Sequence, residues 1–173
     1  MSGSGGHRRI WVCDESYPEV TVGSQRFPYL DMLEDAPEYF YFCRSWWDGI
    51  GIDAAMWWRD HNKRCHYWCL VTGESHTISQ RQELARRMIS PAEFDSLCAS
   101  AIELGILQLK TQQQEIILTH YDDMLGMKRP DGSIHSYFVR CGKHRDARDA
   151  QIRELIWRHA PELRQFYEKG SML

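Results

Sequence analysis

Apolar residues recur along the first half of the chain in patterns that predict helices. Between residues 36 and 48 they form a wide apolar stripe, with Asp35 placed as N-cap and Pro37 in the first turn. Between residues 54 and 71, tryptophan, histidine and cysteine recur at spacings of three and four up to Gly73, which is a suitable helix end. We therefore expect two consecutive helices rich in aromatic residues.

Two further helices are expected in the middle of the chain. The first is short and covers residues 80–88. The second covers residues 91–104 and has a well-marked start, because the segment Ser90-Pro91-Ala92-Glu93 combines an N-cap, a first-turn proline and a capping box. Gly105 is expected to end this helix, since glycine adopts the left-handed conformation that other residues resist.

The apolar period changes after Gly105. Residues 106–110 and 115–120 read as two short antiparallel strands, and the polar stretch TQQQ between them forms the tip of a hairpin. The middle of the chain is therefore expected to fold as three helices followed by two strands.

Several residues of this segment follow a known pattern. Leu84 and Ala85 lie in the second of the three helices, Ala101 and residues 104–107 at the end of the third, and residues 116–121 in the hairpin. With these residues, the segment from 54 to 125 resembles the winged helix-turn-helix superfamily, above all phage replisome-organiser and DnaD-type replication initiation domains. The resemblance implies that the third helix enters the major groove of DNA while the hairpin contacts the backbone or the minor groove.

The C-terminal part carries its own signals. The segment RPDG at residues 129–132 is a turn signal, and residues 133–140 read as a strand. Residues 144–169 are expected to be mostly helical, with a break or kink at Pro161.

Together these patterns predict a mainly α protein with a small β-hairpin. The expected parts are a flexible leader (1–9), an irregular lead-in with an aromatic helix (10–52), a winged-helix domain (53–125) and a basic, mostly helical C-terminal extension (126–173). The aromatic helix is expected to pack in front of the winged helix.

The composition of the chain also predicts the cellular compartment of the protein. The chain has 173 residues, of which 43% are apolar and seven are tryptophan, so it can bury a core. Its six cysteines come without a secretion signal, which favours reduced, buried thiols in a cytoplasmic protein. No run of about 18 uncharged apolar residues is present, so we expect no membrane partner.

Charge and the resemblance together predict DNA binding. The net charge is −3, but the acidic residues gather in the first third of the chain and the basic residues towards its end. We expect a DNA-binding protein of phage or mobile-element replication or transcription regulation. The expected contact residues are Arg81, Arg86, Arg87, Ser96, Ser100, Gln108, Lys110, Gln113, Lys128, Arg129, Lys143 and Arg145.

An alternative follows from the third expected helix. It carries Glu93, Asp95 and Glu103 but no lysine or arginine, whereas neutralisation of phosphate charge usually dominates DNA affinity. The chain is then a protein-interaction module that oligomerises or inhibits a host nucleic-acid enzyme. Its expected partner-binding residues are Trp46, Trp47, Glu93 and Asp95.

Catalytic and metal chemistry receive little support. His61, Cys65 and Cys69 share one face of the expected helix, but no fourth zinc ligand is evident and the same positions suit core packing. The chain contains no phosphate loop, dinucleotide fingerprint, GxSxG or HExxH motif. We expect no catalytic residues, no metal and no cofactor.

Overall fold

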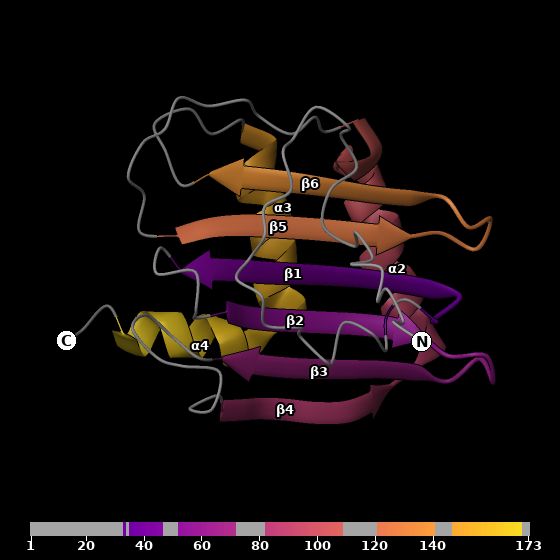
Figure 1. The fold of residues 1–173 in the computed structure, drawn as a ribbon, viewed down its shortest axis with the longest axis horizontal. Coiled ribbons are helices and arrows are strands. Elements are labelled where there is room, and N and C mark those ends of the chain that lie inside the picture. Colours follow the sequence, from indigo (N-terminus) through magenta and orange to yellow (C-terminus); the bar gives the residue numbers. More distant parts are fainter. Residues whose placement is uncertain are drawn as a thin grey trace, which may run out of the picture.

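In the part of the chain that the structure describes, six antiparallel strands form one sheet in the order β4-β3-β2-β1-β5-β6 (Figure 1). The computed structural model describes residue 33 and residues 35–46, 52–71, 82–108, 121–140 and 147–170. The strands are β1 (Glu38–Trp46), β2 (Ile52–Arg59), β3 (Cys65–Val71), β4 (Gln82–Ile89), β5 (Tyr121–Lys128) and β6 (Ile134–Arg140). Strands β1 to β4 form a meander, and the β5–β6 hairpin pairs with the remaining side of β1.

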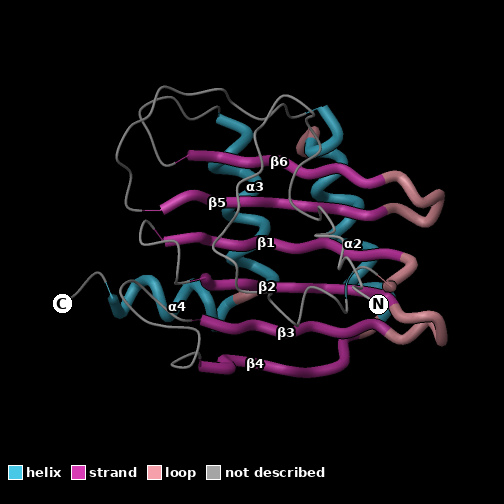
Figure 2. Tube along the Cα trace, in the orientation of Figure 1, coloured by secondary structure: helices cyan, strands magenta, loops and turns pink. Residues whose placement is uncertain are grey.

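Helices α2 (Pro91–Glu103), α3 (Ala147–His159) and α4 (Pro161–Gly170) lie on one face of the sheet (Figures 1 and 2). A short 3-10 helix, η2 (Ile106–Gln108), follows α2. Side chains from this face of the sheet and from the helices form the main hydrophobic core, with Trp57, Phe94 and Leu163 fully buried in it.

This fold corrects the expected one. The protein is not a mainly α winged helix with an aromatic N-terminal helix, because the segments expected as helices at 36–48, 54–71 and 80–88 form the strands β1, β2 with β3, and β4. The structure has helices and strands in roughly equal measure, and the strands belong to one sheet.

The apolar pattern of strand β1 resembles that of a buried helix because both faces of the strand are buried. Phe40 and Phe42 point to the helices, whereas Tyr39 and Tyr41 point to the opposite face, and all four are at most 2% exposed. A strand covered on both faces is a nearly continuous apolar run and lacks the alternation of a half-exposed strand. Such a run also fits the wide apolar stripe of a buried helix.

The expected helix 54–71 is the β2–β3 hairpin. The backbone N–H groups of Asn62 and Arg64 both donate to Asp60 Oδ1, at 2.8 and 2.9 Å, and Lys63 adopts a left-handed φ of 61°. Aspartate and asparagine favour such turns because their short side chains hydrogen-bond to nearby backbone. The polar stretch 60–64 is therefore a turn, and the helical spacing across it arises by chance from two separate strands.

The predicted helix 91–104 is confirmed as α2. Ser90 Oγ accepts the backbone N–H of Glu93 at 3.1 Å, and Pro91 occupies the first turn. Gly105 has a φ of +84°, the left-handed conformation expected of it, and its N–H donates to the carbonyl of Ile102.

The later local signals are also confirmed. Gly132 of the RPDG turn has a φ of +84°, and strand β6 begins at Ile134. Helices α3 and α4 are separated by Ala160, directly before Pro161. The expected hairpin is different: its first residues, 106–108, form a 3-10 helix, and residues 109–120 lie outside the described part of the chain. The expected leader, 1–9, also lies outside it.

Candidate functional site

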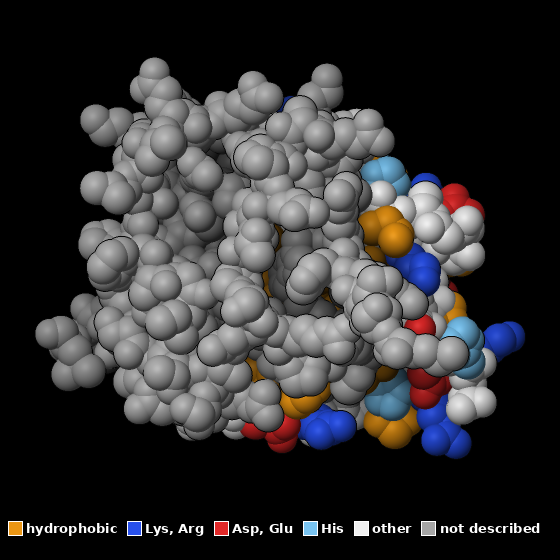
Figure 3. All heavy atoms as spheres, viewed as in Figure 1, with side chains coloured by type: hydrophobic (Ala, Val, Ile, Leu, Met, Phe, Trp, Pro, Cys, Tyr) orange, Lys and Arg blue, Asp and Glu red, His pale blue; other side chains and the backbone are white. Residues whose placement is uncertain are grey.

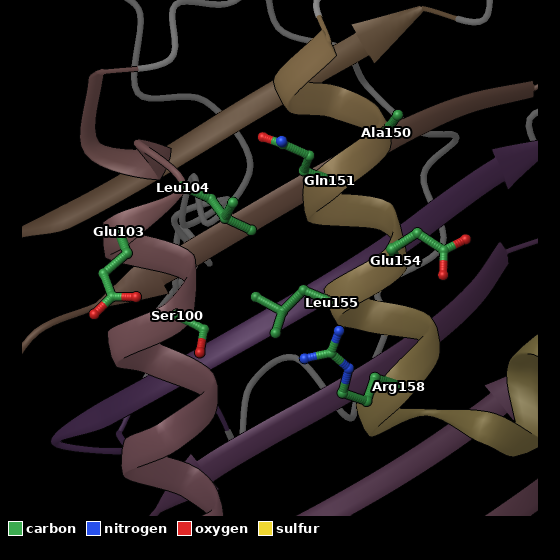
Figure 4. A pocket seen from close by; sticks show the side chains of 8 residues that line it. All are labelled: Ser100, Glu103, Leu104, Ala150, Gln151, Glu154, Leu155 and Arg158. Carbon is green, nitrogen blue, oxygen red and sulfur yellow. The ribbon is translucent and has the colours of Figure 1, made fainter.

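A groove of about 470 Å³ lies between α2 and α3 on the helical side of the molecule (Figure 4). Its lining comes from the last turn of α2 and from one face of α3, where residues three and four apart recur. The lining residues are Ser100, Glu103, Leu104, Ala150, Gln151, Glu154, Leu155 and Arg158.

The groove has an apolar centre and polar sides. Leu155 is buried and Leu104 is half-buried, and Figure 4 shows them pointing towards each other across the gap. Gln151 and Arg158 reach from α3 towards α2, whereas Glu103 points to the outer side of α2. The arrangement gives an apolar contact with hydrogen-bonding and charged groups around it.

Two charged groups at the groove are available for a partner. Among the described residues, neither Glu103 nor Arg158 forms an ion pair, and both are exposed. Glu154 differs, since its carboxylate lies 3.8 Å from the guanidinium of Arg164 on α4. The groove therefore carries one uncompensated negative charge on the α2 side and one uncompensated positive charge on the α3 side.

Helix α2 is anchored to the sheet by Arg59 of β2. Its guanidinium forms ion pairs with Glu38 of β1, at 2.9 Å, and with Asp95 of α2. The same guanidinium lies 5.1 Å from the centre of the buried Phe94 ring. A hydrogen bond with Cys65 and, to a smaller extent, the interactions with Asp95 and Glu38 raise the pKa of Arg59. Asp95, expected as a partner contact, is thus already engaged within the chain.

Helices α3 and α4 are anchored by a buried charge cluster in the middle of the sheet. Arg44 of β1 lies beside Asp53 of β2 and Asp123 of β5, and it donates two hydrogen bonds to Asp123, at 2.7 and 3.0 Å. Arg153 of α3 also donates to Asp123, at 3.1 Å, while Tyr167 of α4 donates to Asp53, at 2.8 Å. The cluster joins three strands to two helices.

The charged groups of the three strands in this cluster are buried. Arg44, Asp53 and Asp123 are at most 6% exposed. Burial raises the pKa of Tyr167 well above its ordinary value, and the nearby Asp53 raises it further. Tyr167 therefore keeps its hydroxyl proton and donates it to Asp53. The two arginines and two aspartates of the cluster balance one another's charge within the protein.

Arg86 and Arg87, expected to bind DNA, lie next to each other on β4 but face opposite sides of the sheet. The Arg86 guanidinium lies over the ring of Trp68, 4.7 Å from its centre. The Arg87 guanidinium donates to Glu162 of α4, at 2.7 Å, and lies over the ring of Tyr67. Tyr67 donates to the same carboxylate, at 3.0 Å, so Arg87 connects the edge of the sheet to α4.

Lys128 and Arg129 lie far from this pair. They are at the end of β5 and in the β5–β6 turn, four strands away from β4 and thus roughly 19 Å across the sheet. Figure 3 shows described side chains near this end of the sheet as a mixture of basic, acidic and histidine groups. The described basic candidates are thus separated across the sheet and do not form one cluster.

The remaining candidates are scattered. Ser96 is exposed on α2, Ser100 lines the groove, Gln108 is exposed in η2, and Glu93 is half-buried in the first turn of α2. Trp46 ends β1, and its side chain lies outside the described part. Trp47, Arg81, Lys110, Gln113, Lys143 and Arg145 lie outside the described residues.

The sequence analysis missed the α3 side of the groove. Four residues of α3 recur at helical spacing and indicate a shared face: Gln151, Glu154, Leu155 and Arg158. The prediction for this helix considered its positive charge and not this face. The partner of this face, the end of α2, follows only from the packing of the two helices.

In the described part of the chain, no helix has the length and apolar character needed to cross a bilayer. Within the same residues, no group of three or more histidine, cysteine, aspartate or glutamate side chains is placed to hold a metal ion. Comparison with protein-family models and with curated proteins found no match for this chain.

Proposed function

We propose that the chain is a protein-interaction module that binds a short segment of a partner protein in the groove between α2 and α3. The observation that carries the proposal is an apolar centre, formed by Leu104 and Leu155, beside two uncompensated charges of opposite sign, Glu103 and Arg158. The proposed contact lies at the C-terminal end of α2, the acidic helix of the alternative considered from the sequence.

The groove defines the chemistry of the segment. An apolar side chain would pack over Leu104 and Leu155, and an aspartate or glutamate would pair with Arg158. A lysine or arginine would pair with Glu103 where the segment leaves the groove over the outer side of α2. Burial of one large apolar side chain contributes about 1.5–3 kcal/mol, whereas an exposed ion pair contributes about 0–1 kcal/mol. The apolar residue therefore supplies most of the affinity, and the charges decide the direction in which the segment lies.

Protein binding is favoured over DNA binding by the contacts of the basic residues. Arg87 is held by Glu162 and Tyr67, and Arg86 by the ring of Trp68. Release of these contacts would have to precede full engagement with phosphate. Lys128 and Arg129 lie four strands away from Arg86 and Arg87, so phosphate contacts made by the two pairs would lie roughly 19 Å apart across the sheet.

The test is a selection of random 12-residue peptides displayed on phage, followed by NMR titration of isotope-labelled protein with the selected peptides. We expect peptides with a central apolar residue between one basic and one acidic residue, and shifts at Ser100, Leu104, Gln151 and Leu155. The double variant Glu103→Lys with Arg158→Glu should prefer peptides with the reversed order of charges.

A matched control is the double variant Asp35→Lys with Lys169→Glu, which exchanges one acidic and one basic exposed residue outside the groove. It should leave the peptide preference unchanged. Selected peptides that shift other residues would overturn the proposal, and so would a failure to select any. Duplex DNA binding at about 50 mM salt that is lost in Arg86→Ala with Arg87→Ala would support the DNA alternative instead.

A further inference from the structure

Strand β4 is one of the two edges of the sheet. Among the described residues it pairs only with β3, and in Figure 1 it is the lowest strand. Its side chains at Gln82, Glu83, Arg86, Arg87 and Met88 are exposed, with Met88 61% exposed. An edge strand presents a row of backbone N–H and C=O groups that can pair with another strand.

An irregularity in β4 places its charges in an unusual arrangement. The pairing of β4 with β3 shifts between Cys69 and Leu70, so that Leu84 and Ala85 both pack on the helical side of the sheet. Glu83 and Arg86 therefore share the opposite face, where both contact Trp68: Glu83 accepts its indole N–H, and Arg86 lies over its ring.

The order of charges along β4 suits antiparallel pairing with itself. The acidic residue, Glu83, lies near the start of the strand, and the basic residues, Arg86 and Arg87, lie near its end. Parallel pairing in register sets like charges side by side, whereas antiparallel pairing sets Glu83 opposite the arginines. A two-fold axis then repeats each favourable pair.

We propose that β4 pairs antiparallel with β4 of a second copy of this chain, which joins the two six-stranded sheets into one continuous sheet. Glu83 of each copy lies opposite Arg86 of the other. Gln82 then lies opposite Arg87, and Leu84 lies opposite Ala85. This dimer goes beyond the proposed binding of a partner segment and uses a different surface.

The register follows from the faces of the side chains. Residues that oppose each other in an antiparallel pair must lie on the same face of the sheet. Leu84, Ala85 and Arg87 face the helices, because they pack on the main core or contact Tyr67, and Gln82 lies beside the buried Val71 of the same face. Glu83, Arg86 and Met88 face the other side, since Met88 lies beside His66, which stacks on Trp58.

Among antiparallel registers that overlap at least six residues of β4, only the one that pairs Glu83 with Arg86 keeps every pair on a common face. The four other registers set Arg86 opposite Leu84, Arg86 opposite Ala85, Leu84 opposite Met88, or Ala85 opposite Met88, and these side chains point in opposite directions. The same register thus satisfies the side-chain faces and the charges.

The test is analytical ultracentrifugation of the full chain over a wide concentration range. The contact is small, so we expect a dimer that dissociates on dilution. Glu83→Arg and Arg86→Glu should each weaken association by about tenfold or more, because each creates two repulsive pairs per dimer. The double variant Glu83→Arg with Arg86→Glu should restore the dimer, since it exchanges the two charges.

The double variant also lacks the hydrogen bond from Trp68 to Glu83, so its recovery cannot come from that intramolecular contact. Thermal unfolding of each variant at low concentration checks that the monomer is folded. The groove variant Glu103→Lys with Arg158→Glu should dimerise as the wild type does. A protein that is monomeric at every concentration would overturn the proposal, as would a dimer that is insensitive to Glu83→Arg and Arg86→Glu.

Discussion

The ring of Tyr41 on β1 lies against Gly126 on β5, its partner across the sheet. A Cβ atom at Gly126 would come within 2.2 Å of the Tyr41 ring, and Tyr41 is completely buried on the face away from the helices. The absence of a side chain at Gly126 therefore makes the space in which this tyrosine packs.

Gly126→Ala should destabilise the protein by about 3 kcal/mol, because a buried aromatic ring must move to admit the new methyl group. The measurement is urea unfolding followed by circular dichroism. Gly132→Ala is the matched control: its Cβ meets nothing within 4 Å, and the loss should be only about 1–2 kcal/mol from the left-handed φ. Equal losses in the two variants would contradict a steric role for Gly126.

Asp123→Ala should cost about 3–5 kcal/mol, since it leaves the buried Arg44 guanidinium without its main partner. The double variant Arg44→Met with Asp123→Leu removes both charges and should cost less than the single variant. Calorimetric unfolding of the two proteins makes the comparison. A double variant less stable than Asp123→Ala would show that the ion pair contributes more than the packing that replaces it.

Stability should fall as the pH decreases from about 7.5 to 5.5. Burial lowers the pKa of His159, and Arg158 lowers it further against the opposing effect of Glu93. The unfolded chain then binds a proton more readily than the folded one, so His159 favours folding above the unfolded pKa and loses this contribution as the pH falls. His159→Gln should flatten part of the slope in urea-unfolding titrations; an unchanged slope would contradict this assignment.

The thiols of Cys69 and Cys98 should resist alkylation in the folded protein. Burial raises the pKa of each to about 12, and only the thiolate is strongly nucleophilic. At pH 8 about one molecule in ten thousand then carries the reactive form. Iodoacetamide labelling with peptide mapping should leave both residues unmodified until urea is added. Rapid labelling of Cys69 in the folded protein would contradict its burial on β3.

The elements that could be predicted from the sequence are those with a local cause. Ser90 caps α2 through a residue three positions away, Gly132 turns the chain within four residues, and Pro161 divides α3 from α4 whatever their surroundings. Each of these signals depends only on residues within a few positions of one another, so it can be predicted without knowledge of the fold.

The strands could not be predicted in the same way. The apolar run of β1 is compatible with a helix or with a strand buried on two faces, and only its pairing with β2 and β5 decides between them. The sequence around Asp60 is typical of a turn. The spacing of the aromatic residues in the segment 54–71 nevertheless favours a helix, and the prediction followed that spacing. The expected order of three helices and two strands, typical of a winged helix, depends on this incorrect helix.

The candidate site depended on contacts between distant parts of the chain. Leu104 and Leu155 meet only because α2 and α3 pack on the same face, and Arg87 meets Glu162 only because α4 packs against β3 and β4. The basic character of Arg86 and Arg87 was evident in the sequence, but their partners were not. The number of charged residues is known from the sequence, but which of them are paired with a neighbour is known only from the fold.

The position of β1 inside the sheet has a consequence for the order of folding. Cys43 and Met124 are partners in register although they lie far apart in the chain, so this pairing must close a long loop and is intrinsically slow. During synthesis, β1 to β4 leave the ribosome before β5 exists. In that interval the apolar β1 is itself an exposed edge, open to pairing with other nascent chains. The β5–β6 hairpin thus closes the strand at greatest risk of aggregation.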